Sequence, residues 1–301
     1  MISIILILLF VFSVLSVPVC HGVISGLYLY GMKIFPGLFI SFILTNILVR
    51  ILQQKNINNP WILVITGLMT GFPNGAYICS WYNKNNPENR LGDMLAGIIN
   101  IPSPAFLISY VYINILEKCI SLPMFLALTY TPVILCSYMA ILFFRDKDNK
   151  KDNAPYIKND KKLIFHFFEE AVDSSINTAL TLGAYVIIFS VIVNIIMHFS
   201  QSNTAGLLIS YLFEISNGLA IIKNAGIPMN ITVLLTVLLD AFGGVCIIMQ
   251  TKSICSSYIS IKKYIYQKLV LCIVTLAMTY LLIYVLNLSL IHISEPTRRT
   301  P

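Results

Sequence analysis

Hydrophobic residues occur in nine long stretches along the chain, separated by short polar connections. A helix that crosses a bilayer needs about 20 apolar residues, and each stretch is close to that length. The stretches cover residues 2–19, 34–52, 61–82, 94–116, 120–144, 176–197, 205–222, 227–249 and 269–286. The pattern predicts an all-α polytopic membrane protein with about eight to nine hydrophobic segments.

Two neighbouring stretches contain residues that interrupt a helix. Residues 71–75 read Gly-Phe-Pro-Asn-Gly, and residues 100–104 read Asn-Ile-Pro-Ser-Pro. Proline cannot donate a backbone hydrogen bond, and glycine weakens a helix. In lipid, an opened backbone is tolerated only where it is buried in protein or lines a watery cavity. Paired interruptions of this kind are typical of the binding site of a secondary transporter, so we expect discontinuous or re-entrant helices here.

The second half of the chain carries two acidic residues inside hydrophobic stretches. Glu214 lies within residues 205–222, which we expect to be re-entrant, and Asp240 precedes the run Ala-Phe-Gly-Gly at 241–244. A carboxylate at the bilayer centre costs about 2.5 to 3.5 kcal/mol on insertion scales, which makes each acid a functional candidate. We predict that Glu214 and Asp240 carry a coupling proton or bind a cation such as Na⁺. The alternative is a hydrogen-bonded structural acid or a re-entrant tip in water.

Composition agrees with the membrane assignment. The chain is 57% hydrophobic and 11% charged, with a mean hydropathy of +0.81, whereas a soluble domain carries about 25% charged residues. Of the net charge of +7, much lies in the linker 145–162 and in Lys252, Lys262, Lys263 and Lys268, which we assign to cytoplasmic loops. We expect no nucleic-acid partner, because the basic residues are scattered and no binding motif accompanies them.

Motifs of enzymes and metal sites are absent from the sequence. It has no H-E-x-x-H, G-x-S-x-G or Walker lysine loop, and its seven cysteines form no C-x-x-C pair. We therefore predict no catalytic residue, no cofactor and no metal site, and transport energy from a gradient or a partner. The acidic residues Asp93, Glu169, Glu170 and Asp173 are expected to be solvated or near helix N-termini.

The two halves of the chain resemble each other weakly, since Gly-Phe-Pro-Asn at 71–74 is echoed by Ala-Phe-Gly-Gly at 241–244. We divide the chain into a first transmembrane helix (1–26), a first repeat (27–119), a connecting helix with a basic linker (120–171) and a second repeat (172–287). Residues 288–298 look like one reading frame of a transposase adapter used for sequencing libraries, so we expect 288–301 to be an artefact.

Four motifs together resemble one family. Residues 67–76 are similar to the G-x-x-x-G-[YF]-P-x-G-A signature of the YlbJ family of sporulation integral membrane proteins, and residues 100–106 are similar to its N-T-S-S-P-L-F stretch. Residues 212–218, and 241–245 followed by Gln250, resemble its second-half motifs. The resemblance runs from about residue 27 to 250.

The resemblance implies a fold and a role. The family belongs with nucleoside-recognition gate domains, which implies two gate-type repeats in a membrane transporter that acts during endospore formation. It further implies transport of a small anion such as dipicolinate by alternating access, in a multi-pass protein of the cell membrane (the outer forespore membrane in a sporulating cell). A non-transporting scaffold for the spore envelope and a nucleoside or ion carrier of the same fold remain alternatives.

The helix interruptions supply the candidate substrate site. Free N–H groups at a restarted helix form an anion site, and two such ends facing each other would suit a pyridine dicarboxylate. The predicted substrate-binding residues are Gly71, Pro73, Asn74, Gly75, Asn100, Ser103, Pro104, Gly243 and Gly244. The alternative is a packing kink, in which glycine permits close helix contact. Expected partners are membrane lipid and a small-molecule anion, with a homo-oligomer left open.

Overall fold

A computed structural model describes residues 2–55, 59–86, 90–145, 161–200, 204–255 and 258–282. These ranges are built from helices and short turns and contain no β-strand. The elements are α1 (Ile2–Val14), α2 (Ser16–Tyr28), the π-helix η1 (Leu29–Ile34), α3 (Phe35–Lys55), α4 (Pro60–Thr70), α5 (Asn74–Asn85), α6 (Leu91–Ile99), α7 (Pro104–Phe106), the π-helix η2 (Leu107–Ile115), α8 (Leu122–Arg145), α9 (Lys161–Ser200), α10 (Thr204–Phe213), α11 (Ile215–Asn224), α12 (Met229–Phe242), α13 (Gly244–Cys255) and α14 (Ile261–Tyr280). Most of the predicted basic linker and the whole predicted artefact tail lie outside the described residues.

Within the described ranges, four helical stretches are long and apolar enough to cross a membrane. They are Leu91–Ile115, Leu122–Phe143, Phe168–Ser200 and Met229–Cys255. Large apolar side chains on their outer faces are exposed, including Phe143 at 73% and Leu180 at 67%. Contiguous apolar surface of this kind is unfavourable in water and matches lipid. The chain is therefore a multi-pass helical membrane protein.

The N-terminal segment, predicted as one transmembrane helix over residues 1–26, is two helices. α1 and the stretch Ser16–Ile34 meet at an angle of 88°, and they count as a fifth candidate span only if the bent pair is taken together. The reason is Pro18, whose ring nitrogen cannot donate to the Val14 carbonyl four residues earlier. Helical bonding resumes at Val19, whose N–H donates to the Leu15 carbonyl at 3.0 Å.

The interruptions expected in the first half are present. α4 ends at Thr70 and α5 begins at Asn74, with a cis peptide bond between Phe72 and Pro73. α6 ends at Ile99, and α7 begins at Pro104. Pro104 occupies the first helical position, where its missing N–H costs nothing.

The second half also contains two interrupted helices in succession. α10 and α11 are separated by Glu214, whose backbone is extended, and α12 and α13 are separated at Gly243, which is left-handed with φ of 83°. Each half of the chain therefore has two consecutive helices that stop and restart.

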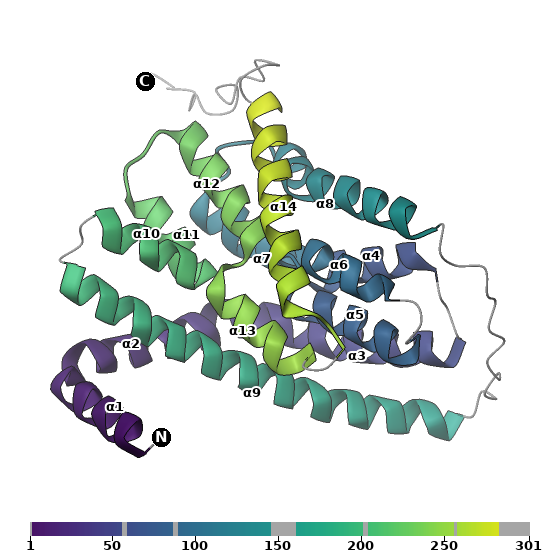
Figure 1. The fold of residues 1–301 in the computed structure, drawn as a ribbon, viewed down its shortest axis with the longest axis horizontal. Coiled ribbons are helices and arrows are strands. Elements are labelled where there is room, and N and C mark those ends of the chain that lie inside the picture. Colours follow the sequence, from purple (N-terminus) through teal and green to yellow (C-terminus); the bar gives the residue numbers. More distant parts are fainter. Residues whose placement is uncertain are drawn as a thin grey trace, which may run out of the picture.

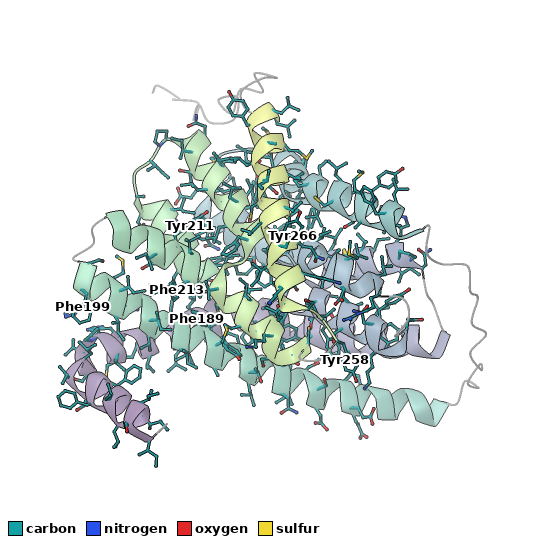
Figure 2. The ribbon with its side chains drawn as sticks, in the orientation of Figure 1. Phe189, Phe199, Tyr211, Phe213, Tyr258 and Tyr266 are labelled. Carbon is teal, nitrogen blue, oxygen red and sulfur yellow. The ribbon has the colours of Figure 1, made fainter. Side chains whose placement is uncertain are left out.

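Long helices hold these interrupted pairs together (Figure 1). α9 runs along one side of the molecule and packs on α2 and α3. α14 crosses the front and contacts α6, α12 and α8. Phe189 of α9 and Phe213 at the end of α10 bring these two helices together, with their ring centroids 6.1 Å apart (Figure 2). Buried apolar side chains form two clusters, one around Phe42, Leu107 and Phe125 and the other around Leu95 and Tyr264.

Candidate functional site

The first two interruptions pack directly against each other. A Cβ atom added to Gly71, which has φ of 72°, would lie 2.7 Å from the Ser103 Cα atom. A Cβ atom added to Gly75 would lie 2.8 Å from the Ile99 carbonyl oxygen. Glycine at these two positions therefore lets the restart of one helix touch the end of the next.

Asn100 connects this contact to the C-terminal part of the chain. Its Oδ1 accepts a hydrogen bond from the Ala76 N–H at 3.2 Å, within the first turn of α5. Its Nδ2 donates to the Tyr264 hydroxyl at 2.8 Å and to Thr251 Oγ1 at 3.2 Å. Because Asn100 is fully buried, these bonds satisfy an amide that would otherwise be costly to bury.

Lys268 joins the two halves through their helix ends. It is fully buried, and its Nζ donates to the Ala241 carbonyl at 2.9 Å and to the Asn100 carbonyl. Ala241 lies in the last turn of α12, and Asn100 caps the C-terminal end of α6. The lysine thus sits where two half-helices, one from each half of the chain, present their C-terminal carbonyls.

The assignment of Lys268 to a cytoplasmic loop was wrong. α14 begins at Ile261, so Lys268 lies two turns inside a helix. Tyr264, Lys268, Leu271 and Thr275 are all buried, at the spacing of one helical face. This buried face is hard to recognise in the sequence, because the neighbouring Lys262 and Lys263 at the start of α14 are exposed.

Glu214 is a buried helix cap. Its side chain is 2% exposed, and its Oε2 accepts a hydrogen bond from the Asn217 N–H at 2.7 Å. This arrangement satisfies one of the free N–H groups at the start of α11 and places a carboxyl group at the positive end of the helix. The carboxyl group of Glu214 is thus held at the first turn of α11.

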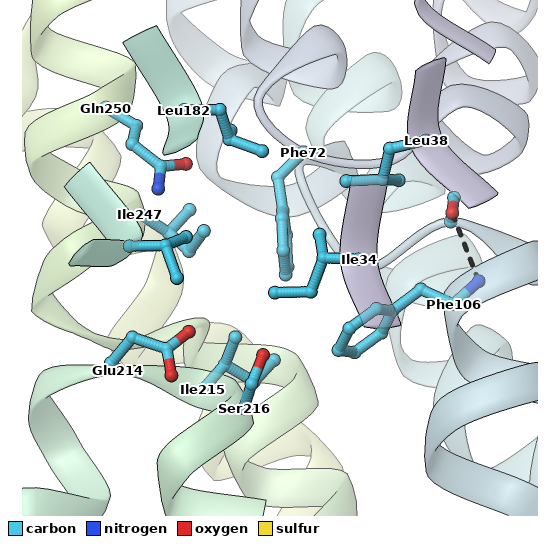
Figure 3. Close-up of a pocket in the computed structure, with 12 residues that line it drawn as sticks. Ile34, Leu38, Phe72, Phe106, Leu182, Glu214, Ile215, Ser216, Ile247 and Gln250 are labelled. Carbon is cyan, nitrogen blue, oxygen red and sulfur yellow. Dashed lines mark hydrogen bonds between the residues drawn. The ribbon is translucent and has the colours of Figure 1, made fainter. Parts of the chain in front are cut away.

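A small cavity lies where the interruptions meet (Figure 3). Its volume is about 20 Å³, enough for about one water molecule. Glu214 and Gln250 lie on one side, and Phe72, Leu38 and Phe106 lie on the other. The remaining lining residues are Ile34, Ser103, Leu182, Val186, Ile215, Ser216 and Ile247. Three of the four interruptions therefore contribute side chains to one cavity.

The lining is largely apolar, with a few polar groups. Glu214 supplies a carboxylate, Ser103 and Ser216 supply hydroxyl groups, and Gln250 supplies an amide. The Gln250 Nε2 donates to Cys246 Sγ at 3.1 Å, but its Oε1 is buried without a hydrogen-bond partner. An unpartnered buried oxygen is expensive, so this atom is available for a ligand or for water. The lining contains no cationic side chain.

Of the predicted site residues, Ser103 and Glu214 line the cavity. The other predicted substrate-binding residues lie at the interruptions but are not among the lining residues. They are Gly71, Pro73, Asn74 and Gly75 at the α4–α5 turn, Asn100 and Pro104 at the α6–α7 turn, and Gly243 and Gly244 at the α12–α13 turn. Asn74 is buried, and its Nδ2 has no hydrogen-bond partner.

Asp240 lies apart from the cavity lining, in the last turn of α12. It is fully buried, and neither carboxylate oxygen has a hydrogen-bond partner. Tyr130 and Tyr211 are within electrostatic range of it, and the Tyr130 hydroxyl also lacks a partner. Thr236, one turn earlier on the same helix, is a third buried group without a partner.

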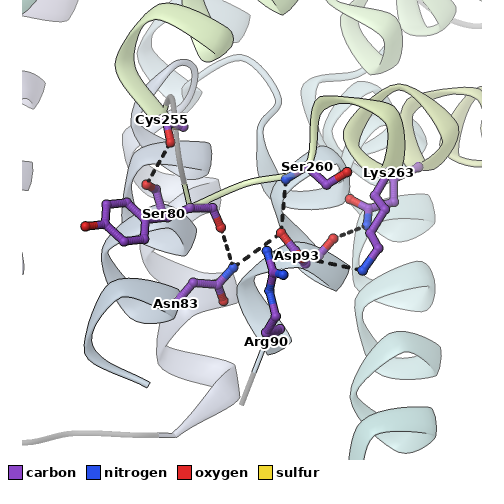
Figure 4. Close-up of polar contacts among 9 residues, drawn as sticks. Ser80, Asn83, Arg90, Asp93, Cys255, Ser260 and Lys263 are labelled. Carbon is purple, nitrogen blue, oxygen red and sulfur yellow. Dashed lines mark hydrogen bonds and ion pairs between the residues drawn. The ribbon is translucent and has the colours of Figure 1, made fainter. Parts of the chain in front are cut away.

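Asp93 forms a polar junction outside the cavity (Figure 4). We expected Asp93 to be either solvated or near a helix N-terminus. It lies in the first turn of α6, and it is not solvated, because it is only 1% exposed. Arg90 and Lys263 approach its Oδ2 at 2.9 and 3.4 Å, and the Ser260 N–H donates to Oδ1 at 3.1 Å. The cluster fixes the beginning of α14 against α6, which in turn positions Lys268.

Sequence reasoning did not identify most of the apolar lining. Leu182 and Val186 on α9 are four residues apart, as are Ile34 and Leu38, so each pair forms one turn of a helical face. This spacing alone does not distinguish a helical face that lines a cavity from a helical face that contacts lipid. Gln250, in contrast, lies at the end of a motif that the sequence analysis quoted.

No protein-family model matches the chain, and neither a curated protein nor a solved structure is significantly similar to it.

Proposed function

We propose that the protein is a secondary transporter with two gate-type repeats, built from the eight to nine hydrophobic segments of the sequence. It moves a small anionic, dipicolinate-like metabolite across the forespore membrane by alternating access. The observation that supports this proposal best is the convergence of three helix interruptions on one buried cavity that contains a single carboxylate. Discontinuous helices whose ends meet around a common site are the usual construction of a carrier.

The interruptions favour transport over a scaffold. A membrane scaffold can be built from continuous helices, because nothing requires it to open its backbone at depth. Four interrupted helices leave many N–H and C=O groups outside the regular ladder, and each buried one must find a partner. A substrate site explains why such an arrangement is useful.

Glu214 gives the proposed carrier a coupling group. An ionised carboxylate would repel an anionic substrate across a cavity without cationic side chains. Co-transport of a proton on Glu214 removes that repulsion, so we infer that anion and proton move together. Asp240 is the second candidate for ion coupling, because it is buried and neither of its carboxylate oxygens has a hydrogen-bond partner.

The structure is compatible with an occluded state. A cavity of about 20 Å³ cannot hold dipicolinate or a nucleoside, so the interruptions must separate before a substrate enters. The helix ends around the cavity are the natural places for such movement, since they lack the continuous hydrogen bonds of a helix interior.

A second candidate is a nucleoside carrier of the same class. Phe72 and Phe106, whose ring centroids lie 6.5 Å apart, line the cavity together with the Gln250 amide. Aromatic rings can stack on a base, and an amide can pair with its edge. The same rings would also stack on a pyridine dicarboxylate, so the two candidates differ in the charge they require.

Flux measurements distinguish these functions. The purified protein is reconstituted into liposomes, and uptake of radiolabelled dipicolinate and uridine is measured with and without an inward proton gradient. The proposal expects proton-stimulated dipicolinate uptake, whereas uridine uptake alone supports the second candidate. In a spore-forming host, deletion of the gene should lower spore dipicolinate while the mother cell retains it. Normal spore dipicolinate after deletion contradicts the leading proposal.

A further inference from the structure

Lys268 is a buried cation without a carboxylate partner in the part of the chain that the structure describes. Its ammonium group contacts two backbone carbonyls, those of Asn100 and Ala241, and lies 5.8 Å from the centroid of the Tyr264 ring. Cys272, one turn later on α14, is within electrostatic range of it. Removing an ammonium group from water costs several kcal/mol, so these contacts must compensate a large penalty.

The two carbonyls form an electrostatically negative position. Asn100 and Ala241 lie at the C-terminal ends of α6 and α12, and the C-terminal end of a helix carries about half a negative charge. In carriers with broken helices, carbonyls and half-helix C-terminal ends of this kind coordinate a coupling cation such as Na⁺. Carbonyl oxygen is a ligand that hard cations prefer.

We propose that the Lys268 ammonium is a tethered cation that occupies a cation site between the Asn100 and Ala241 carbonyls. A free Na⁺ ion is therefore not required at this position, and the chain supplies the charge that holds the two half-helices together. The proposal concerns the ion requirement of the carrier, and its transport part rests on the proposed function. This cation site is distinct from the cavity beside Glu214, because Lys268 is not among the residues that line that cavity.

Shortening the side chain should convert the tethered site into an open one. Lys268→Ala leaves the two carbonyls in place and removes both the ammonium group and the methylene chain. The space and the negative potential then become available to a small cation. A lysine that serves only as a packing element or a simple hydrogen-bond donor predicts loss of stability with no preference for any salt.

The binding experiment uses the full chain purified in detergent. Thermal unfolding is followed in NaCl and in choline chloride at equal ionic strength, for the wild type, Lys268→Ala and Lys262→Ala. Lys262 is exposed on the same helix and serves as the matched control. We expect the Tm of the wild type and of Lys262→Ala to be equal in the two salts. For Lys268→Ala we expect a lower Tm in choline and a Tm in Na⁺ that rises with its concentration, as linkage requires for an ion that binds the folded state.

Two results overturn the proposal. One is a Lys268→Ala protein whose Tm is the same in both salts, and the other is a wild type that Na⁺ stabilises specifically. If Lys268→Ala does not yield folded protein, Lys268→Ser provides a hydroxyl to the carbonyls and is measured in the same way. The second result, specific stabilisation of the wild type by Na⁺, can be measured even if neither variant folds.

A transport measurement separates this inference from the proposed function. In proteoliposomes, wild-type dipicolinate uptake should be equal in Na⁺ and choline, and Lys268→Ala uptake should be about tenfold higher in Na⁺, within the usual range of coupling between two sites. If the wild type carries no dipicolinate while Lys268→Ala still responds to Na⁺ in the thermal experiment, the function fails and the cation site stands. If the wild type carries dipicolinate and Lys268→Ala ignores Na⁺ in both experiments, the cation site fails and the function stands.

Discussion

Gly71 and Ser103 touch through their backbones, so that a Cβ atom at position 71 would lie 2.7 Å from the Ser103 Cα atom. This contact joins the interruption between α4 and α5 to the interruption between α6 and α7. The Ser103 hydroxyl accepts the Phe106 N–H at 3.3 Å, and Ser103 is one of the residues that line the cavity. Two helix ends beside the cavity thus depend on one close approach of main chains.

Gly71→Ala should destabilise the protein strongly. The substitution forces a Cβ into the Ser103 backbone. It also places a side chain on a backbone with φ of 72° and ψ of −173°, a region that essentially only glycine adopts and that costs about 1 to 3 kcal/mol. We expect a lower Tm in detergent and loss of dipicolinate uptake. Gly226→Ala is the comparison for a positive φ without a clash, because Gly226 has φ of 61° and no atom within 4 Å of an added Cβ. If Gly71→Ala is no more harmful than Gly226→Ala, the backbone contact is not important.

Glu214→Gln should abolish proton-coupled uptake while the amount of protein in the membrane stays normal. Glutamine keeps the length of the side chain and an oxygen that can accept the Asn217 N–H, so the start of α11 remains capped. It removes the only carboxylate of the cavity lining. Glu117→Gln is the control, since Glu117 is 67% exposed and pairs with Lys223. Unchanged proton-coupled uptake by Glu214→Gln removes this residue from the mechanism.

The two buried aspartates should respond in opposite directions to the same substitution. Asp93→Asn weakens contacts with Arg90 and Lys263 and should cost about 1.5 to 3 kcal/mol, the range for hydrogen bonds to charged groups. Asp240→Asn removes a carboxylate that has no hydrogen-bond partner and should raise the Tm. Thermal unfolding of both variants in detergent checks the pair. A fall in Tm for Asp240→Asn shows that the native carboxylate is stabilised by a bound group.

The two aromatic residues of the cavity should contribute to substrate affinity. Phe72→Leu preserves an apolar side chain but removes the ring, so we expect weaker binding by about 0.5 to 1.5 kcal/mol, the usual worth of an aromatic pair. Concentration dependence of uptake measures the change in KM. Phe125→Leu is the matched control, because Phe125 is fully buried but lies outside the cavity lining. Equal KM values for the two variants contradict stacking at Phe72.

The positions of the interruptions could be predicted from local sequence, because proline and glycine act on the backbone where they stand. Residues 71–73 and 100–103 leave the helix as expected, and Glu214 and Gly243 mark the second pair. Which of these residues would face a common cavity could not be predicted. That depends on how the two halves pack, and the same glycines serve a packing contact as well as a site.

Lys268 shows where composition misleads. Three lysines within seven residues indicate a solvated loop, and for Lys262 and Lys263 the exposure is as expected. The burial of Lys268 follows only from the helical register of α14 and from two carbonyls contributed by α6 and α12. In the N-terminal segment, hydropathy predicted one helix, but the structure has two helices that meet at 88°. We attribute the break to Pro18, which lacks a backbone N–H donor.

The central claim is that the cavity beside Glu214 opens alternately to the two sides of the membrane. The most direct test places a single cysteine at Ser216, after replacement of the seven native cysteines, and measures its reaction with a charged, membrane-impermeant thiol reagent in oriented proteoliposomes. The account predicts labelling from either side and protection by dipicolinate. Labelling from one side only, or from neither side while dipicolinate flux continues, would contradict it.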